Sequence, residues 1–163
     1  MRFVALALFA LLVGSVAAAA PVPKEKPPLN PDLAAMQGTW KLTDIKSGGL
    51  SLGAKFAADL ELTMEVRDGT MITTGQKFKQ RITSTFALDT TADPRRITVA
   101  TGKETDLDGK PLADAATPKT TVCLYKIDGD TLTIAGGTGD EKDPPKNFTD
   151  KGVMSMTYTR VKK

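Results

Sequence analysis

The feature that most constrains the fold is a two-residue alternation of apolar and polar side chains that begins at Gln37. In its clearest segment the apolar positions are Leu60, Leu62, Met64 and Val66. In a second segment they are Phe78, Ile82, Phe86 and Leu88. A period of two is typical of strands that bury one face and leave the other in water. Both segments are therefore predicted to be half-buried antiparallel strands.

Turn residues separate the alternating segments from one another. Asp68-Gly69 and Asp128-Gly129 are dipeptides that favour the backbone angles of tight hairpins, so each is predicted to pair its flanking strands. Eight strands are predicted, over residues 40–46, 59–67, 70–74, 77–88, 95–101, 120–127, 131–135 and 153–161. One helical turn is expected ahead of them, because Asn30 can cap a helix that has Pro31 in its first position.

These elements predict an all-β fold, an eight-stranded antiparallel up-and-down barrel of the lipocalin-like kind with a short N-terminal helical turn. Closing the sheet leaves no strand edge free to recruit another chain. A two-sheet sandwich is the alternative. Residues 102–118 and 136–152 are rich in Gly, Pro, Asp and Lys and are expected to be long loops at the barrel mouths.

The N-terminal residues differ from the rest of the chain. Arg2 is followed by an unbroken apolar run from Phe3 to Val13 and then by small residues, which is the layout of a secretory signal. We expect residues 1–19 to be a signal peptide, 20–32 a proline-rich flexible tether and 33–163 the folded domain. The protein is then exported, to the periplasm or the medium, and no segment is apolar for long enough to be a transmembrane helix.

Composition excludes several kinds of chemistry. The chain has no histidine and one cysteine, so neither histidine-based catalysis nor a zinc site of His and Cys ligands is expected. Cys123 is interpreted as an inert, buried thiol. Glu104, Asp106 and Asp108 resemble the start of a calcium loop, but Ala115 stands where such a loop needs its bidentate glutamate. We expect no enzyme activity, no cofactor, no metal and, since the basic residues are scattered, no nucleic-acid partner.

The arrangement of Gly38-Thr39-Trp40 at the first strand and Arg160 near the end of the last resembles the lipocalin and calycin barrels. The resemblance implies that the indole packs against the basic side chain and closes one end of the barrel, with Gly38, Trp40 and Arg160 as the closing residues. A guanidinium over an indole face is worth about 1 kcal/mol.

A narrower resemblance rests on three stretches: Met36–Leu42, Tyr125–Leu132 and Thr157–Lys163. Together they look like the uncharacterised lipocalin-like domain that is abundant among planctomycete bacteria, over about residues 33–163. Members typically follow a signal peptide, and no activity is settled for the family, so the resemblance implies a fold and leaves function open. Residues 102–118 look longer than the family's usual connection.

The barrel interior is the candidate site. By alternation the inward positions are Leu62, Met64, Phe86, Val99, Tyr125, Met154, Met156 and Tyr158. Methionine adapts its shape to a ligand, and the predicted ligand-binding residues are Met64, Phe86, Tyr125, Met156 and Tyr158. Two interpretations stay open: a protein that binds a small hydrophobic ligand, or a cell-envelope structural or protein-interaction module whose core is full.

Overall fold

The computed structural model describes residues 30–162, apart from 113–118 and 138–143. The predicted signal peptide and residues 20–29 of the predicted tether lie outside the described residues. Pro31 and Asp32, which the prediction placed in the tether, form the first turn of helix α1 (Pro31–Met36). Asn30 caps this helix as expected, because its side chain accepts a hydrogen bond of 2.9 Å from the Asp32 N–H.

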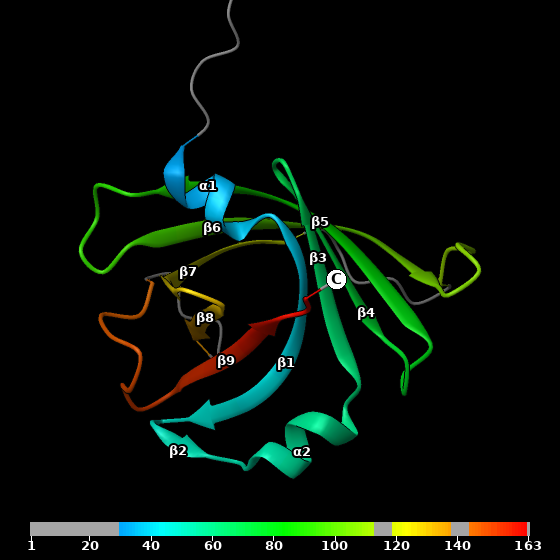
Figure 1. The fold of residues 1–163 in the computed structure, drawn as a ribbon, viewed down its shortest axis with the longest axis horizontal. Helices are drawn as coiled ribbons and strands as arrows, with labels where there is room; N and C mark the ends of the chain where they lie inside the picture. The colour runs from blue at the N-terminus through cyan, green and yellow to red at the C-terminus, as the bar shows by residue number, and fades with distance from the viewer. Residues whose placement is uncertain (1–29, 113–118, 138–143, 163) are drawn as a thin grey trace, which may run out of the picture.

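The strands that the structure describes form one antiparallel sheet that closes in a ring (Figure 1). Their bounds are β1 (Gly38–Ser47), β2 (Leu50–Ser51), β3 (Leu62–Arg67), β4 (Thr70–Gly75), β5 (Gln80–Asp89), β6 (Arg96–Asp106), β7 (Thr120–Asp128), β8 (Thr131–Gly137) and β9 (Val153–Arg160). Each strand from β3 to β8 pairs with the strand that follows it in the sequence. The first strand, β1, pairs with both β3 and β9 and so closes the ring. The all-β class and the closed antiparallel sheet are confirmed, and the two-sheet alternative is not the arrangement observed.

Both predicted hairpins are present. Arg67 is the register partner of Thr70 across the first turn, and Asp128 is the partner of Thr131 across the second. The backbone reaches a positive φ at Asp68 and at Gly129, as tight turns require.

The prediction was wrong between residues 48 and 61. A two-residue strand, β2, and a second helix, α2 (Ala54–Asp59), precede β3, which begins at Leu62 rather than at residue 59. The segment Ala54–Asp59 has a high alanine content, which favours a helix, and Leu60 is the residue at its C-terminal cap. Neither described helix is long and apolar enough to cross a bilayer.

The start of β5 was also predicted wrongly. The strand begins at Gln80 rather than at residue 77, because Lys79 has a positive φ of 50° that interrupts the extended backbone. Phe78, which was expected on the buried face, therefore lies in the turn after β4 with 52% of its surface exposed.

The predicted loop 102–118 begins later than expected. Its first residues continue β6 as far as Asp106. A register shift occurs opposite Thr83, where a side chain at Gly102 would approach the Thr83 carbonyl oxygen to 2.5 Å. Glycine is therefore needed for the two strands to stay paired through this irregularity.

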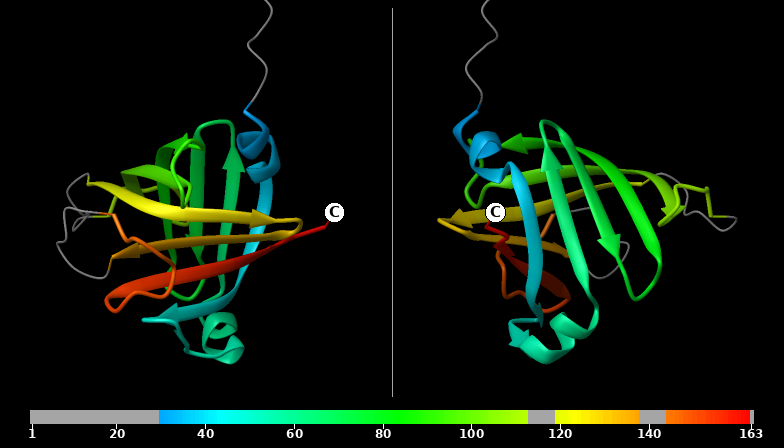
Figure 2. Two further views of the ribbon diagram at one scale, coloured as in Figure 1. Left: turned by 90° about the vertical axis from the view of Figure 1, so that its left-hand side faces the viewer. Right: turned by 45° about the vertical axis from the view of Figure 1, so that its right-hand side comes forward.

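The two helices mark opposite ends of the ring (Figure 2). The α1 end carries the start of β1, the end of β3 and the end of β9; the α2 end carries the end of β1, the start of β3 and the start of β9. The side chains of the main apolar core lie in the interior of the ring. A smaller cluster of Leu124, Ala135 and Val153 lies on the outer face of β7–β9 and packs against Phe148.

Candidate functional site

Trp40 and Arg160 are in contact at the α1 end of the ring. Trp40 is fully buried, and its indole N–H donates a hydrogen bond of 2.8 Å to the Met36 carbonyl oxygen. The Arg160 guanidinium carbon lies 4.1 Å from the centroid of the Trp40 ring. Gly38 has a φ of 116°, and a Cβ there would lie 3.2 Å from an Arg160 nitrogen, which gives a physical reason for glycine in this motif. The two residues singled out by the motif are thus in direct contact.

Arg160 also binds the chain that precedes β1. Its terminal nitrogens donate hydrogen bonds to the carbonyl oxygens of Ala35 and Gln37. Its Nε donates to Asp130 at 3.1 Å, and Lys162 contacts the same carboxylate. The hydrogen bond from Lys162 and the charges of Lys162 and Arg160 lower the pKa of Asp130. The guanidinium therefore ties α1, β1 and the β7–β8 turn together.

A second polar contact fixes α1 over the interior. The Tyr125 hydroxyl donates a hydrogen bond of 2.6 Å to Asp32, whose carboxylate also forms an ion pair of 2.8 Å with Arg95. Burial, followed by the hydrogen bond to Asp32, raises the pKa of Tyr125. Tyr125 therefore has a packing and anchoring role, and its hydroxyl already has a partner.

Burial within the ring differs between its two halves. Most interior side chains of the α1 half are buried, and these include Trp40, Leu42, Met64, Val66, Ile97, Tyr125, Leu132 and Tyr158. Interior side chains toward the α2 end pack against the same core but keep part of their surface exposed, and these include Leu62, Val99, Cys123, Ile134, Met154 and Met156. Ile45 departs from this division, since it lies in the strand that α2 contacts and is buried. Phe86, Leu88 and Ile127 depart from it in the other direction, since they are partly exposed toward the α1 ends of β5 and β7.

The five predicted lining residues all belong to this interior cluster or pack against it. Met64, Tyr125 and Tyr158 are buried in the α1 half, whereas Met156 is partly exposed toward the α2 end. Phe86 is partly exposed in the half of β5 nearer the α1 end. The Tyr158 hydroxyl donates to the Met156 sulfur at 3.3 Å, so these two residues are in contact. Of the five residues, Met156 and Phe86 thus keep accessible surface, whereas Met64, Tyr125 and Tyr158 keep little.

Two lining residues were not identified from the sequence as part of this site. Cys123 is partly exposed on the interior side, and a Cβ at Gly136 would lie 3.0 Å from its sulfur. Ile134 is the register partner of Tyr125 and of Met156 on its two neighbouring strands. The alternation contains the signal for both, because Cys123 is two residues from Tyr125 and Ile134 two from Leu132. Burial raises the pKa of the Cys123 thiol, which keeps it protonated near neutral pH.

A surface groove of about 510 Å³ lies beside the connection between β5 and β6 and reaches Tyr125 and Ile127. Its lining includes Asp93, Arg95, Lys126 and Phe148. The Lys126 ammonium lies 5.3 Å from the centroid of the Phe148 ring, so this aromatic face is already covered by a cation. The ring interior is therefore the better candidate for an apolar ligand.

The acidic motif considered for calcium is part of a turn. The Asp106 carboxylate accepts backbone hydrogen bonds from Asp108 at 3.0 Å and from Lys110 at 2.8 Å. Over residues 30–112, 119–137 and 144–162, no group of three or more His, Cys, Asp or Glu side chains is placed to hold a metal ion. Ala115, on which the sequence argument depended, lies outside the described residues.

Comparison with known proteins gives no relative: no family model, curated protein or solved structure matches the chain. The resemblance to the lipocalin-like family therefore stays a prediction that rests on the sequence motifs.

Proposed function

We propose that the protein is an exported lipocalin-like barrel that binds one small hydrophobic molecule in the α2 half of its interior. The observation that carries the proposal is the difference in burial between the two halves. In the α1 half, Trp40, Met64 and Tyr125 are at most 1% exposed, which leaves little surface for a ligand. Toward the α2 end, Met154, Met156 and Ile134 face the same core with surface still accessible.

The chemistry of the lining selects an apolar ligand. Two methionines and an isoleucine offer polarizable and aliphatic surface, and methionine adapts to irregular shapes. The hydroxyl groups of the two interior tyrosines are occupied, since Tyr158 donates to Met156 and Tyr125 donates to Asp32. A ligand that needs strong hydrogen bonds or a counter-charge would find no free partner among these side chains.

The size of the ring limits the ligand to a single small molecule. A ring of about eight strands has an interior that side chains can fill completely or that holds one ligand. Here the large rings of Trp40, Tyr125 and Tyr158 occupy the α1 half. The volume available is therefore a fraction of the interior.

Export is part of the proposal and is supported by the sequence of residues 1–19 alone. The second candidate is a cell-envelope interaction module with a full core. It is favoured by the exposed side chains of Leu50, Phe56 and Phe78, which lie outside the ring. The two candidates differ in whether the interior binds anything.

Titration with an environment-sensitive apolar fluorophore tests the proposal. We expect saturable binding by the purified protein and loss of binding when Met156→Trp fills the lining. Leu50→Trp is the matched control, because Leu50 is 77% exposed and the same indole there leaves the interior unchanged. Circular dichroism checks that each variant keeps its strands. Absence of saturable binding by the unaltered protein would favour the interaction module.

The single cysteine gives an independent measurement that needs no substitution. Cys123 is partly exposed in the proposed lining, so a small thiol reagent should modify it slowly. Saturating fluorophore is expected to slow that modification further by covering the thiol. An unchanged modification rate under saturating fluorophore would place the binding site elsewhere.

A further inference from the structure

The exposed apolar side chains are concentrated at the α2 end. Five large hydrophobic side chains stand out as exposed among the described residues. Four of them are Leu50, Leu52, Phe56 and Phe78, with exposed fractions of 77%, 46%, 47% and 52%. The fifth, Val161, lies just beyond β9 at the α1 end. Such a concentration on one side of a molecule indicates an interaction surface.

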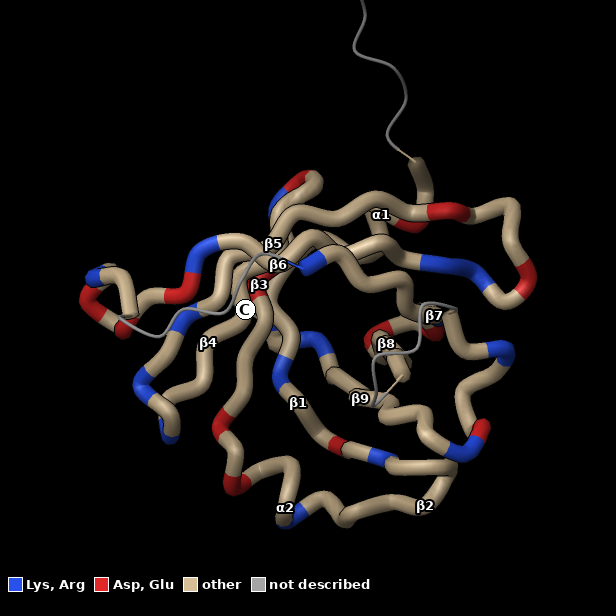
Figure 3. Tube along the Cα trace, turned by 180° about the vertical axis from the view of Figure 1, so that it is seen from behind, with Lys and Arg blue, Asp and Glu red and all other residues tan. Residues whose placement is uncertain are grey.

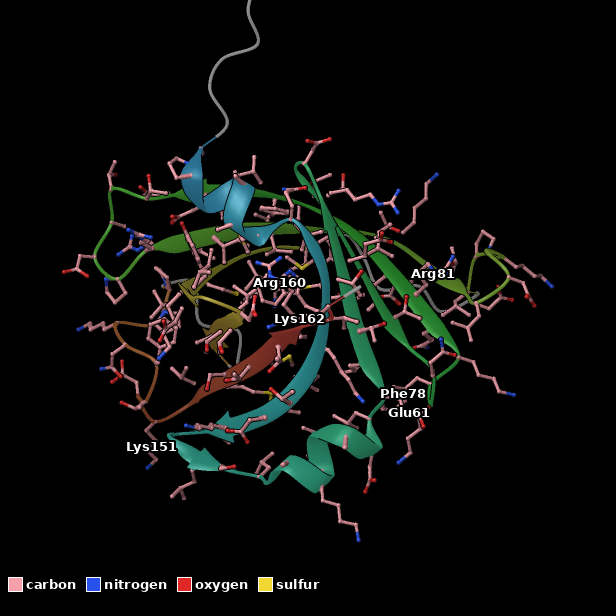
Figure 4. All side chains as sticks on the ribbon, in the orientation of Figure 1. Glu61, Phe78, Arg81, Lys151, Arg160 and Lys162 are labelled. Carbon is pink, nitrogen blue, oxygen red and sulfur yellow. The ribbon has the colours of Figure 1, made fainter. Side chains whose placement is uncertain are left out.

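The two segments that carry these four side chains are neighbours in space. Leu50, Leu52 and Phe56 belong to β2, α2 and their connection, and Phe78 lies in the β4–β5 turn. The Gln76 N–H donates to the Glu61 carbonyl oxygen at 3.4 Å, which ties that turn to the residue ahead of β3. Figure 4 shows Phe78 and Glu61 beside α2, on the side of the molecule away from α1.

Phe78 is placed at the rim of the ring. A Cβ at Gly75 would lie 3.1 Å from the aromatic ring of Phe78 and 3.2 Å from a methyl of Leu62. The Phe78 side chain therefore lies next to Leu62, which belongs to the accessible lining. The turn thus presents an aromatic side chain at the α2 end.

Basic side chains flank both aromatic residues. Exposed Lys77 and Lys79 stand on either side of Phe78 in the sequence, and exposed Arg81 is the second residue of β5. Lys55 precedes Phe56. Within these two segments the carboxylates are those of Asp59 and Glu61, so cations outnumber anions there. Two further carboxylates lie beside the segments: Asp44 accepts a hydrogen bond of 2.7 Å from Ser51, and Asp106 is the register partner of Gln80. Figure 3 shows basic positions beside α2 and at the adjacent end of β4, with acidic positions between them.

We propose that this surface docks on an anionic lipid bilayer. We call it the α2-end patch: Leu50, Leu52, Phe56 and Phe78 with Lys55, Lys77, Lys79 and Arg81. Phe56 and Phe78 enter the boundary between headgroups and acyl chains, and the flanking cations contact anionic headgroups. A second copy of the chain fits this patch less well, since two surfaces with the same basic excess repel each other.

Docking goes beyond ligand binding and does not depend on it, because the patch lies outside the interior and can be tested on the ligand-free protein. It also turns the accessible half of the ring toward the bilayer. An apolar molecule dissolved in the membrane would then reach the interior without crossing water.

Vesicle sedimentation tests the proposal. The purified protein is mixed with vesicles of phosphatidylcholine, with or without phosphatidylglycerol. We expect binding only to the vesicles that contain phosphatidylglycerol, and weaker binding as salt is raised. The double variant Phe56→Ser, Phe78→Ser should bind roughly tenfold or more weakly, because two aromatic side chains that would be transferred from water into the bilayer are missing. Lys77→Glu with Lys79→Glu should weaken binding to a similar degree.

The α1 end supplies matched controls. Val161→Ser removes an exposed apolar side chain, and Arg67→Glu with Arg96→Glu reverses two exposed charges, all away from the patch. These variants should bind vesicles as the unaltered protein does. Equal loss in patch and control variants, or equal binding to both kinds of vesicle, would overturn the proposal. The proposal would also be overturned if the protein self-associated without vesicles and Phe78→Ser abolished that association. The patch would then be a contact between two copies of the chain.

The unchanged fold of each variant is checked by its unfolding midpoint. As a second measurement, Phe78→Trp places a fluorophore in the patch, while the native Trp40 is fully buried. Its emission should shift to the blue with phosphatidylglycerol vesicles and stay unchanged with phosphatidylcholine alone. No shift with either would contradict insertion of this turn.

Discussion

Arg160 forms hydrogen bonds with residues 123 and 125 positions earlier in the sequence. It stacks on Trp40, donates to two carbonyl oxygens next to α1 and binds Asp130. The resemblance to lipocalin and calycin barrels, carried by Gly38-Thr39-Trp40 and Arg160, implied the stacking. The carbonyl partners could not be predicted, because they depend on how the chain enters β1 rather than on residue type.

Replacing Arg160 should therefore destabilise the protein well beyond the loss of a surface charge. Arg160→Met keeps much of the apolar stem and leaves two carbonyl oxygens without their charged donor. We expect the free energy of unfolding to fall by about 2–4 kcal/mol. Urea unfolding followed by circular dichroism measures this change.

Lys162→Met is the matched control, because Lys162 contacts the same Asp130 carboxylate but its side chain is 80% exposed. Its loss should cost less than about 1 kcal/mol. Equal effects of the two substitutions would mean that the Arg160 contacts with α1 add nothing to stability.

At the level of single residues, sequence reasoning failed where local backbone overrode the pattern. Phe78 fits the alternation of its segment, but the positive φ at Lys79 places it in a turn. The apolar–polar alternation predicts the face on which a side chain lies only where the backbone is extended. Residues 76–79 are Gln-Lys-Phe-Lys, which are not typical turn residues and so do not mark where that extension stops.

Among the elements, α1 was predicted and α2 was not. Asn30, Pro31 and Asp32 carry explicit start signals for a helix, and α1 begins there. The N-terminal cap of α2 is Gly53, which offers no side-chain hydrogen bond, so no comparable signal precedes it. Residues 47–58 were therefore left without a predicted helix or strand, and only Asp59 of α2 was assigned to the strand that follows.

The docking of α1 depends on a shared carboxylate, which a double-mutant cycle can measure. Asp32→Ala leaves the Tyr125 hydroxyl without its acceptor and Arg95 without its ion pair. We expect a loss of about 1–3 kcal/mol from the free energy of unfolding. In a Tyr125→Phe background the same substitution should cost less, since no hydroxyl is then left unsatisfied. Identical costs in both backgrounds would show that the Tyr125–Asp32 hydrogen bond contributes nothing.

For the whole molecule, the closed antiparallel sheet was predictable because period, hairpin signals and strand number agree with one another. The closing pair, β1 and β9, brings together the two ends of the folded region, from Trp40 with Arg160 to Ser47 with Met154. The division of the interior was not predictable. Alternation assigns Met64 and Met156 to the same face, and only the three-dimensional packing distinguishes the buried one from the accessible one.

Global stability should fall at alkaline pH for a specific reason. Burial raises the pKa of Tyr158 from 10.0 to about 12, so the folded state holds a proton that the unfolded state releases. The stabilisation is complete below pH 10 and is lost as the pH rises to about 12. It amounts to roughly 2–3 kcal/mol.

Tyr158→Phe removes this titration, so its free energy of unfolding should decline less between pH 10 and about 12 than that of the unaltered protein. Urea unfolding at several pH values measures the difference. Parallel declines would mean that Tyr158 ionises as freely in the folded state as in the unfolded one.

The uneven burial of the interior has a consequence for how such a chain can change over generations. Side chains beside Trp40 hold the molecule together, and substitutions there are costly. Those around Met154 and Met156 contribute less to that task and can be exchanged more freely. New selectivity can therefore arise by altering one half of the interior while the other half preserves the architecture.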